Sequence, residues 1–178
     1  DVDENARMRD VIRAVEDAFA AYARGNAQMP AKSYIDLPQH DGDFRSMPAY
    51  IDAGDWEAAG VKWVNSHPGN PDRHDLPTVM GTMVYSDPAT ALPLALLDGT
   101  SLTRLRTGAA AAVATRYLAR EGATSLGLVG AGIQSYSQLE AVAEVRPIER
   151  VVVADRDPDA IAALRERYGD TYDVSEGS

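Results

Sequence analysis

Residues 124–156 read TSLGLVGAGIQSYSQLEAVAEVRPIERVVVADR, and the order of residue types in this stretch decides the fold. An apolar strand pattern covers residues 125–129, and the glycine turn Gly130-Ala131-Gly132 follows at once. A helical pattern begins near Ile133, and three valines ending at Val153 predict a second buried strand. Strand, glycine turn, helix and strand in this order predict a parallel βαβ unit.

The small residues of the turn favour a dinucleotide site over an ordinary glycine turn, which is the alternative. Gly130 would allow the tight turn, and Gly132 would let a pyrophosphate approach the backbone with no Cβ in the way. Ser135 replaces the usual third glycine and is small enough for close packing of helix and strand. Free N–H groups and the positive end of the helix dipole would face the phosphates. We expect cofactor contacts from Gly130, Ala131, Gly132, Ile133, Gln134 and Ser135.

The second strand ends at an acidic residue, Asp155, where a carboxylate can accept a hydrogen bond from a ribose 2′-OH. A carboxylate there repels a 2′-phosphate and favours NAD. Arg156 comes next and could instead hold the extra phosphate of NADP. We expect NAD, with NADP possible, and place both residues in the cofactor site.

The composition is that of a soluble protein, for which we expect a cytoplasmic location. Of its 178 residues, 45% are hydrophobic, enough for a sizeable core, and none is cysteine. No apolar run reaches the roughly 18 residues of a membrane span, and no signal peptide opens the chain. The sequence begins with Asp1 rather than Met, so we expect it to belong to a longer product.

The charge balance is strongly acidic, with 27 acidic against 17 basic residues and a net charge of −10. A field of this sign repels nucleic acid, so a nucleic-acid partner is not expected. The only lysines are Lys32 and Lys62. An ordinary solvated surface explains the acidity, and adaptation to a salty cytoplasm, a halophilic character, is the sharper hypothesis.

The region before the glycine turn predicts an α+β domain. An amphipathic helix covers Met8–Ala23, with Ile12, Phe19 and Tyr22 at helical spacing. Strand patterns follow at residues 31–37, 44–51 (interrupted by Pro48), 60–64, 78–86 and 92–97, with a loop at 67–76 and a hairpin turn at 87–90. An alanine-rich helix, capped by Thr100 or Ser101, has its body at 108–120, and Gly122 ends it.

The fold class predicted is therefore α/β: an N-terminal α+β domain, residues 1–122, followed by the first part of a Rossmann domain, residues 123–178. Asp157-Pro158 begins a further helix with an inner stripe ending at Tyr168, and 171–174 begins a third strand. A full doubly wound sheet has about six strands. The Rossmann domain is therefore expected to be incomplete.

Four blocks of sequence resemble the ornithine cyclodeaminase/mu-crystallin family, and within it most closely the archaeal-type alanine dehydrogenases. The blocks are Arg45-Ser46-Met47-Pro48-Ala49-Tyr50, Gly60-Val61-Lys62, Leu102-Thr103-Arg104-Leu105-Arg106-Thr107 and Gly130-Ala131-Gly132-Ile133-Gln134-Ser135. The resemblance implies a homodimer whose first domain binds substrate and forms the dimer interface. It also implies hydride transfer between a nicotinamide and the α-carbon of a small amino acid or 2-oxo acid.

The resemblance also implies roles for four residues. Arg45 resembles the arginine that binds the substrate carboxylate, which suits a guanidinium fork, although a surface arginine is the alternative. Lys62 resembles a catalytic lysine at the reacting carbon, where a partly buried amine can serve as acid or base, although it could be a snorkelling strand lysine. Arg106 and Thr107, expected to open a helix, resemble a pair near the cofactor phosphates and the substrate. A cap threonine beside a solvated arginine is the alternative.

Other candidates are weaker. His40, His67 and His74 have no metal-ligand spacing, and no metal site is expected. Trp56 and Trp63 are expected in the core or an interface. The family also uses an aspartate near the substrate amino group, farther into the Rossmann domain than this sequence extends.

The expected function is NAD-dependent oxidative deamination of L-alanine to pyruvate and ammonia, by an enzyme of the amino-acid dehydrogenase class. An ornithine cyclodeaminase, which forms proline and ammonia, stays open, as does a ketimine reductase. The non-enzyme alternative is a mu-crystallin-like NAD(P)H-binding protein. Activity of the 178 residues alone is doubtful, because the expected nicotinamide half of the site lies beyond them.

Overall fold

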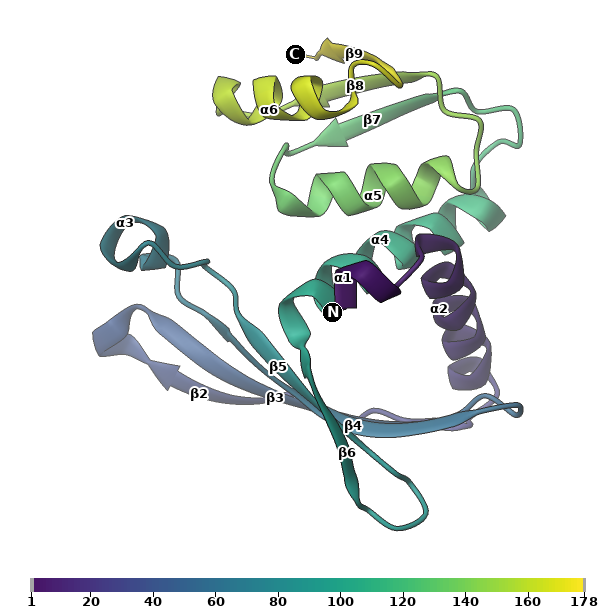
Figure 1. Ribbon diagram of the computed structural model, residues 1–178, viewed down its shortest axis with the longest axis vertical. Helices are drawn as coiled ribbons and strands as arrows, with labels where there is room; N and C mark the ends of the chain where they lie inside the picture. The colour runs from purple at the N-terminus through teal and green to yellow at the C-terminus, as the bar shows by residue number, and fades with distance from the viewer. Residues whose placement is uncertain (1, 178) are drawn as a thin grey trace. The chain divides into compact units, whose positions relative to one another are not determined.

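A computed structural model describes residues 2–177 and divides them into two compact units (Figure 1). The first unit comprises residues 2–3 and Asp17–Thr103. The second comprises Glu4–Glu16 and residues 104–177. The divisions fall inside three helices, α1 (Val2–Asn5), α2 (Met8–Ala23) and α4 (Gly99–Leu118). The domain boundary expected near Gly122 stays a prediction.

The first unit is built on a six-stranded antiparallel sheet. Its central path runs β1-β3-β4-β5-β6, and β2 also pairs with β3. The elements of this region are α1 (Val2–Asn5), β1 (Ala27–Gln28), β2 (Ser33–Leu37), the 3-10 turn η1 (Pro38–His40), β3 (Gly42–Asp52), β4 (Glu57–Ser66), α3 (Asn70–His74), β5 (Gly81–Ser86) and β6 (Pro93–Asp98).

Strand β3 is continuous through Pro48, where the sequence predicted an interruption. On one side, β3 pairs with β4 along its whole length. On the other side, β2 pairs with residues 42–46 and β1 with residues 50–51. Pro48 therefore lies opposite the gap between β1 and β2, an edge position where a missing backbone N–H is tolerated.

Three further expectations need correction. The segment expected as a loop at 67–76 contains the helical turn α3, which has a proline in its first turn. Strand β5 begins only at Gly81, three residues later than predicted. Phe19 and Tyr22 are 53% and 59% exposed, so the apolar side of α2 is buried only in part.

The second unit contains the predicted βαβ arrangement. Its three strands are parallel in the order β7-β8-β9, with helices between them (Figure 1). The elements are β7 (Ser125–Val129), α5 (Ile133–Ala143), β8 (Arg150–Ala154), α6 (Pro158–Tyr168) and β9 (Asp173–Glu176). Asp157 caps α6 by accepting from the Asp159 N–H at 3.0 Å, as the Asp-Pro pair predicts. The α/β fold class, with one antiparallel and one parallel sheet, is confirmed.

Two apolar clusters stabilise the second unit. One joins the sheet to its helices and includes Leu139, Val151, Val153, Ile161 and Leu164, each at most 3% exposed. The other joins α2 to the alanine-rich part of α4 and to α5 around Ile12, Ala109 and Ala112. No helix within residues 2–177 is long and apolar enough to cross a membrane.

Candidate functional site

The glycine turn has the backbone conformation that its sequence predicts. Gly130 ends β7 with φ +100°, a conformation that side chains disfavour. Its N–H donates to the Ala154 carbonyl at 2.8 Å, which holds the turn against the end of β8. The turn therefore lies at the carboxyl edge of the parallel sheet, where open α/β sheets bind ligands.

Open space lies in front of the turn. A Cβ on Gly132 would meet nothing within 4 Å, so a ligand can approach the backbone there. Gly132 is the N-cap of α5, and no side chain caps this helix end. Ser135 is buried, and its hydroxyl donates to the Gly132 carbonyl at 2.7 Å. The Ser135 N–H also donates to this carbonyl, at 2.9 Å, so an anion would be bound by the N–H groups that precede it in the first turn of α5.

Asp155 directly follows strand β8, and its side chain contacts the backbone of the glycine turn. Its carboxylate accepts from the Ala131 N–H at 2.6 Å and from the Asp157 N–H at 3.0 Å. The backbone hydrogen bond from Ala131, followed by that from Asp157, lowers the pKa of Asp155 below its ordinary value. The side chain is exposed, as is that of Arg156. Asp155 thus fixes the turn and keeps a charged carboxylate at its edge.

Two cavities flank Gly130. One has a volume of about 670 Å³ and is lined by Val129, Gly130, Ala154, Asp155, Arg156 and Gly177. The other has a volume of about 360 Å³ and is lined by Gly127, Leu128, Val129, Gly130, Gly132, Ile133, Gln134, Ser135 and Gln138. In the second cavity Gln134 Oε1 is buried without a hydrogen-bond partner among residues 2–177.

These features fit a dinucleotide. Gly130 and Gly132 leave the backbone accessible, Asp155 offers an acceptor, and the amide of Gln134 has an unmet hydrogen bond that a ligand could satisfy. All the glycine-turn residues predicted from sequence line these cavities except Ala131, whose N–H is held by Asp155.

In the first unit, the strand register brings Arg45 and Lys62 to the same face of the sheet. Arg45 is paired with Val64, and Met47 with Lys62. Paired residues share a face, and so do residues two apart along a strand. Arg45 and Lys62, two of the predicted substrate-binding residues, are therefore diagonal neighbours on adjacent strands.

Asp43 holds the guanidinium of Arg45 in a two-point contact. Nε and Nη2 of Arg45 each donate to an Asp43 carboxylate oxygen at 2.7 Å. Their hydrogen bond keeps the pKa of Asp43 below its ordinary range. Arg45 also lies over the Tyr34 ring, 5.4 Å from its centroid. Because a guanidinium has five N–H donors, the edge that carries Nη1 stays available for a second carboxylate.

Lys62 is linked to α4 by a side-chain hydrogen bond. Its Nζ donates to Thr103 Oγ1 at 2.8 Å, and the Thr103 hydroxyl donates to the Gly99 carbonyl at 2.6 Å. The lysine is half-buried in β4. Its ammonium is therefore held at one side of the sheet face that also carries Arg45.

The prediction that Arg106 and Thr107 open a helix is wrong. Helix α4 begins at Gly99, so both residues lie well inside it. The Thr107 hydroxyl is therefore not a helix-start group. Arg106 is exposed and Thr107 is half-buried. Their predicted contacts with cofactor and substrate stay predictions.

Two residues of the site were missed in the sequence. Asp43 lies just before the strand predicted at 44–51, but β3 includes it, and its spacing of two from Arg45 puts both on one face of that strand. Thr103 lies within a block that resembles the family, but its partner Lys62 is 41 residues away. No local pattern reports such a contact.

Within residues 2–177, no group of three His, Cys, Asp or Glu residues is arranged to hold a metal ion.

The family model for the ornithine cyclodeaminase/mu-crystallin family matches residues 1–175. The chain belongs to this family. It is 47% identical over 155 residues to an alanine dehydrogenase of Archaeoglobus fulgidus, covering 87% of this chain and 46% of that protein. It is 37% identical over 160 residues to an L-lysine cyclodeaminase of Streptomyces rapamycinicus, covering 86% of this chain and 45% of that protein.

Among solved structures, the chain is similar to an archaeal alanine dehydrogenase dimer with bound NAD, at 43% identity and a TM-score of 0.91. The match covers 99% of this chain and 53% of that one. The chain thus spans about half the length of the relatives it matches.

Proposed function

We propose that this chain is part of an NAD-dependent amino-acid oxidoreductase, with L-alanine as the first candidate substrate. The reaction would convert L-alanine, water and NAD⁺ reversibly to pyruvate, ammonium, NADH and a proton. The observation that carries the proposal is the glycine turn with Asp155 bound to the Ala131 N–H at 2.6 Å. Its similarity to an alanine dehydrogenase at 47% identity supports the substrate.

The cofactor would be held by the second unit. The N–H groups at the start of α5 would bind the pyrophosphate, and Asp155 would accept from a ribose hydroxyl. A carboxylate at this position supports NAD, although Arg156 beside it leaves NADP open. When bound, the nicotinamide supplies the acceptor and donor of hydride.

The substrate would be held by the first unit. Arg45 would bind the carboxylate through the guanidinium edge that Asp43 does not use. Lys62 would polarise the substrate carbonyl or imine, or transfer a proton there. Thr103 would keep the lysine Nζ in position.

The test is NADH formation from L-alanine by the complete protein that contains this chain. Lys62→Ala should lower kcat far more than it lowers cofactor affinity. Lys32→Ala is the matched control, because Lys32 is the only other lysine and is exposed. A pure binding protein would show no turnover, and Lys62→Ala would leave its cofactor affinity unchanged.

A second candidate is a cyclodeaminase, favoured by 37% identity to an L-lysine cyclodeaminase. In that reaction the hydride leaves and returns, so L-ornithine would yield proline and ammonia without net NADH. Measuring ammonia and NADH together separates the two functions. Equal amounts of both from L-alanine support the dehydrogenase, and ammonia without NADH from L-ornithine or L-lysine supports the cyclodeaminase.

We also propose that the complete protein forms a homodimer, as the solved alanine dehydrogenase does. Several large side chains of β6 are exposed, including Leu94 at 52% and Leu96 at 73%. Light scattering on the complete protein would give its mass in solution. A monomer at micromolar concentration would contradict the proposal.

A further inference from the structure

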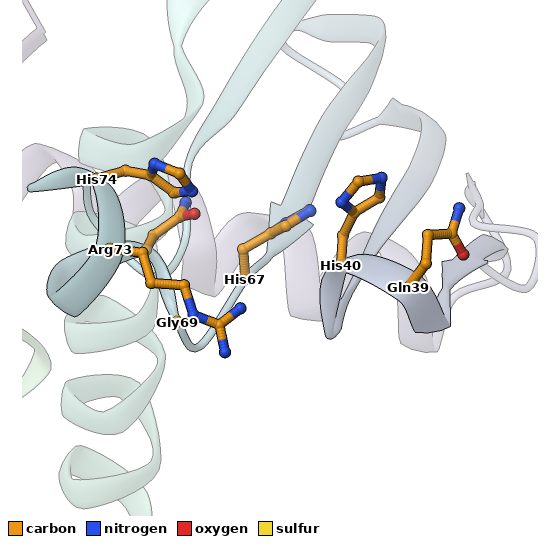
Figure 2. A pocket seen from close by; sticks show the side chains of 7 residues that line it. Gln39, His40, His67, Gly69, Arg73 and His74 are labelled. Atoms are coloured by element: carbon orange, nitrogen blue, oxygen red, sulfur yellow. The ribbon is translucent and has the colours of Figure 1, made fainter.

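A cavity in the first unit is lined by all three histidines of the chain. It lies where η1, the end of β4 and α3 meet, and its volume is about 190 Å³. This is smaller than the roughly 300–1,000 Å³ of pockets that enclose drug-sized ligands. Its lining residues are Gln39, His40, His67, Gly69, Asn70, Arg73 and His74 (Figure 2).

The lining contains basic residues and no acidic ones, whereas the chain as a whole is strongly acidic. The sequence carries 27 acidic residues and a net charge of −10, yet none of the seven lining residues is acidic. One is an arginine, three are histidines and two are amides. The nearby carboxylate of Asp43 is already paired with Arg45 at 2.7 Å. The lining itself therefore offers an anion hydrogen-bond donors and no carboxylate.

The hydrogen bonds around His67 assign its proton. Asn65 Oδ1 accepts from the Met80 N–H at 3.0 Å, so the amide NH₂ of Asn65 faces His67. Nδ1 of His67, 3.1 Å from Asn65 Nδ2, must then accept this hydrogen bond. The ring proton is therefore on Nε2, which becomes a donor. Figure 2 shows the His67 ring extending toward His40.

Arg73 lies on the short helix α3, and its guanidinium occupies the space beside Gly69, which has no side chain. A Cβ on Gly69 would lie 3.1 Å from the Arg73 guanidinium carbon, so the guanidinium packs against this glycine. Among residues 2–177, no carboxylate pairs with the Arg73 guanidinium. Its planar donors are those that proteins use for phosphate.

We propose that this cavity binds a phosphate group, as inorganic phosphate or as the exposed phosphate of a small metabolite. Arg73, His40, His67 and His74 would supply donors from three elements around one concave surface. A tetrahedral ion with several oxygens can accept hydrogen bonds from donors that lie on separate elements. A metal ion does not fit, because the histidines form no ligating cluster within residues 2–177 and Arg73 would repel it.

Histidine NMR of the complete protein tests the proposal directly, because all three histidines of this chain line the cavity and replacing each by glutamine assigns its signal. Inorganic phosphate is added at constant ionic strength and pH, with chloride as the balancing anion. We expect saturable shifts of all three imidazole Cε1–H signals. Glycerol phosphate, titrated in parallel, distinguishes a site for a phosphate group from one that accepts only the free ion.

Arg73→Gln should weaken phosphate binding about tenfold or more, because it removes a charge-assisted contact. Arg24→Gln is the matched control, since Arg24 is also exposed and removes the same charge outside the cavity. The proposal is overturned if phosphate moves no histidine signal more than chloride does. It is also overturned if Arg73→Gln and Arg24→Gln bind phosphate equally well.

Discussion

Lys62 and Thr103 are joined by a 2.8 Å hydrogen bond from the lysine Nζ to the threonine Oγ1. The same hydroxyl donates to the Gly99 carbonyl, so its acceptor lone pairs face the lysine. A flexible lysine side chain on β4 is thereby fixed to the first turns of α4. We infer that Thr103 is a positioning residue for the proposed catalytic ammonium.

Replacing Thr103 by valine keeps the side-chain shape but removes the acceptor. We expect kcat on L-alanine to fall about tenfold or more, because a hydrogen bond to a charged group is worth roughly 1.5–3 kcal/mol. Thr103→Ser should restore most of the rate, and cofactor affinity should change in neither variant. Steady-state kinetics of the complete protein measure this. Equal rates for the valine and serine variants would mean that the hydroxyl does not position Lys62.

Asp155 accepts a hydrogen bond from the Ala131 N–H, so replacing Asp155 should weaken both cofactor binding and the glycine turn. Asp155→Asn keeps the shape but removes the charge, so we expect NAD to bind about tenfold more weakly. The preference for NAD over NADP should also shrink, because the carboxylate that repels the 2′-phosphate of NADP is gone while Arg156, which attracts it, remains. Asp170→Asn, at an exposed aspartate after α6, serves as the control. Fluorescence titration with each dinucleotide gives both affinities, and unchanged selectivity would contradict the role of the carboxylate.

The lowered pKa of Asp155 also gives a pH dependence with a definite sign. Its folded-state pKa lies below the ordinary value of 3.8, so the stabilisation is present above that value. It is lost as the pH falls through the folded-state pKa. We expect wild-type stability to decline more steeply than that of Asp155→Asn below about pH 4. Thermal unfolding of both proteins between pH 2 and pH 6, at about unit steps, tests this, and parallel curves would contradict it.

Asp43 and Arg45 form a contact whose loss should affect substrate binding more than chemistry. In Asp43→Asn the amide oxygen can still accept one hydrogen bond from Arg45, but the second hydrogen bond and the negative charge are lost. We expect Asp43→Asn to raise KM for the amino acid about tenfold with a smaller change in kcat. Asp36→Asn, an exposed aspartate on β2, is the control. A fall in kcat alone would show that the pair does not serve substrate binding.

The features predicted correctly are those that depend on neighbours in sequence. The glycine turn, Asp155 and the Asp157 cap are local signals, and each lies where its pattern indicates. Backbone conformation at Gly130 and the first turn of α6 follow from residue types alone. The parallel βαβ unit could therefore be predicted in some detail.

The features missed depend on distant contacts or on competing local signals. Gly99 begins α4 although glycine is a poor helix former, and the hydroxyls after it resembled a cap. The lysine contact of Thr103 bridges 41 residues, and no periodicity reports it. Helical spacing gave Phe19 and Tyr22 a common face but could not say that this face stays about half exposed.

Arg146 gives the last prediction, which concerns stability rather than catalysis. The residue is 9% exposed, and its guanidinium donates to carbonyls rather than to a carboxylate. Nε donates to the Arg120 carbonyl at 2.9 Å, and Nη2 lies 2.9 Å from the carbonyls of Thr115, Arg116 and Ala119. These carbonyls end α4 and the turn after it, where a helix leaves carbonyls without partners of its own. Those of Thr115 and Arg120 also accept from the N–H groups of Ala119 and Ala123. Arg146 therefore caps α4 and ties it to the segment after α5.

Arg146→Met fills similar space but removes the side-chain donors from these carbonyls. We expect the free energy of unfolding to fall by about 3 kcal/mol, because several charge-assisted hydrogen bonds are lost together. Arg146→Lys should restore only part of this, since an ammonium cannot reach so many carbonyls in one plane. Arg13→Met, at an exposed arginine of α2, should cost less than about 0.5 kcal/mol. Urea unfolding of the four proteins measures the differences, and equal midpoints for Arg146→Met and Arg13→Met would show that the cap contributes no stability.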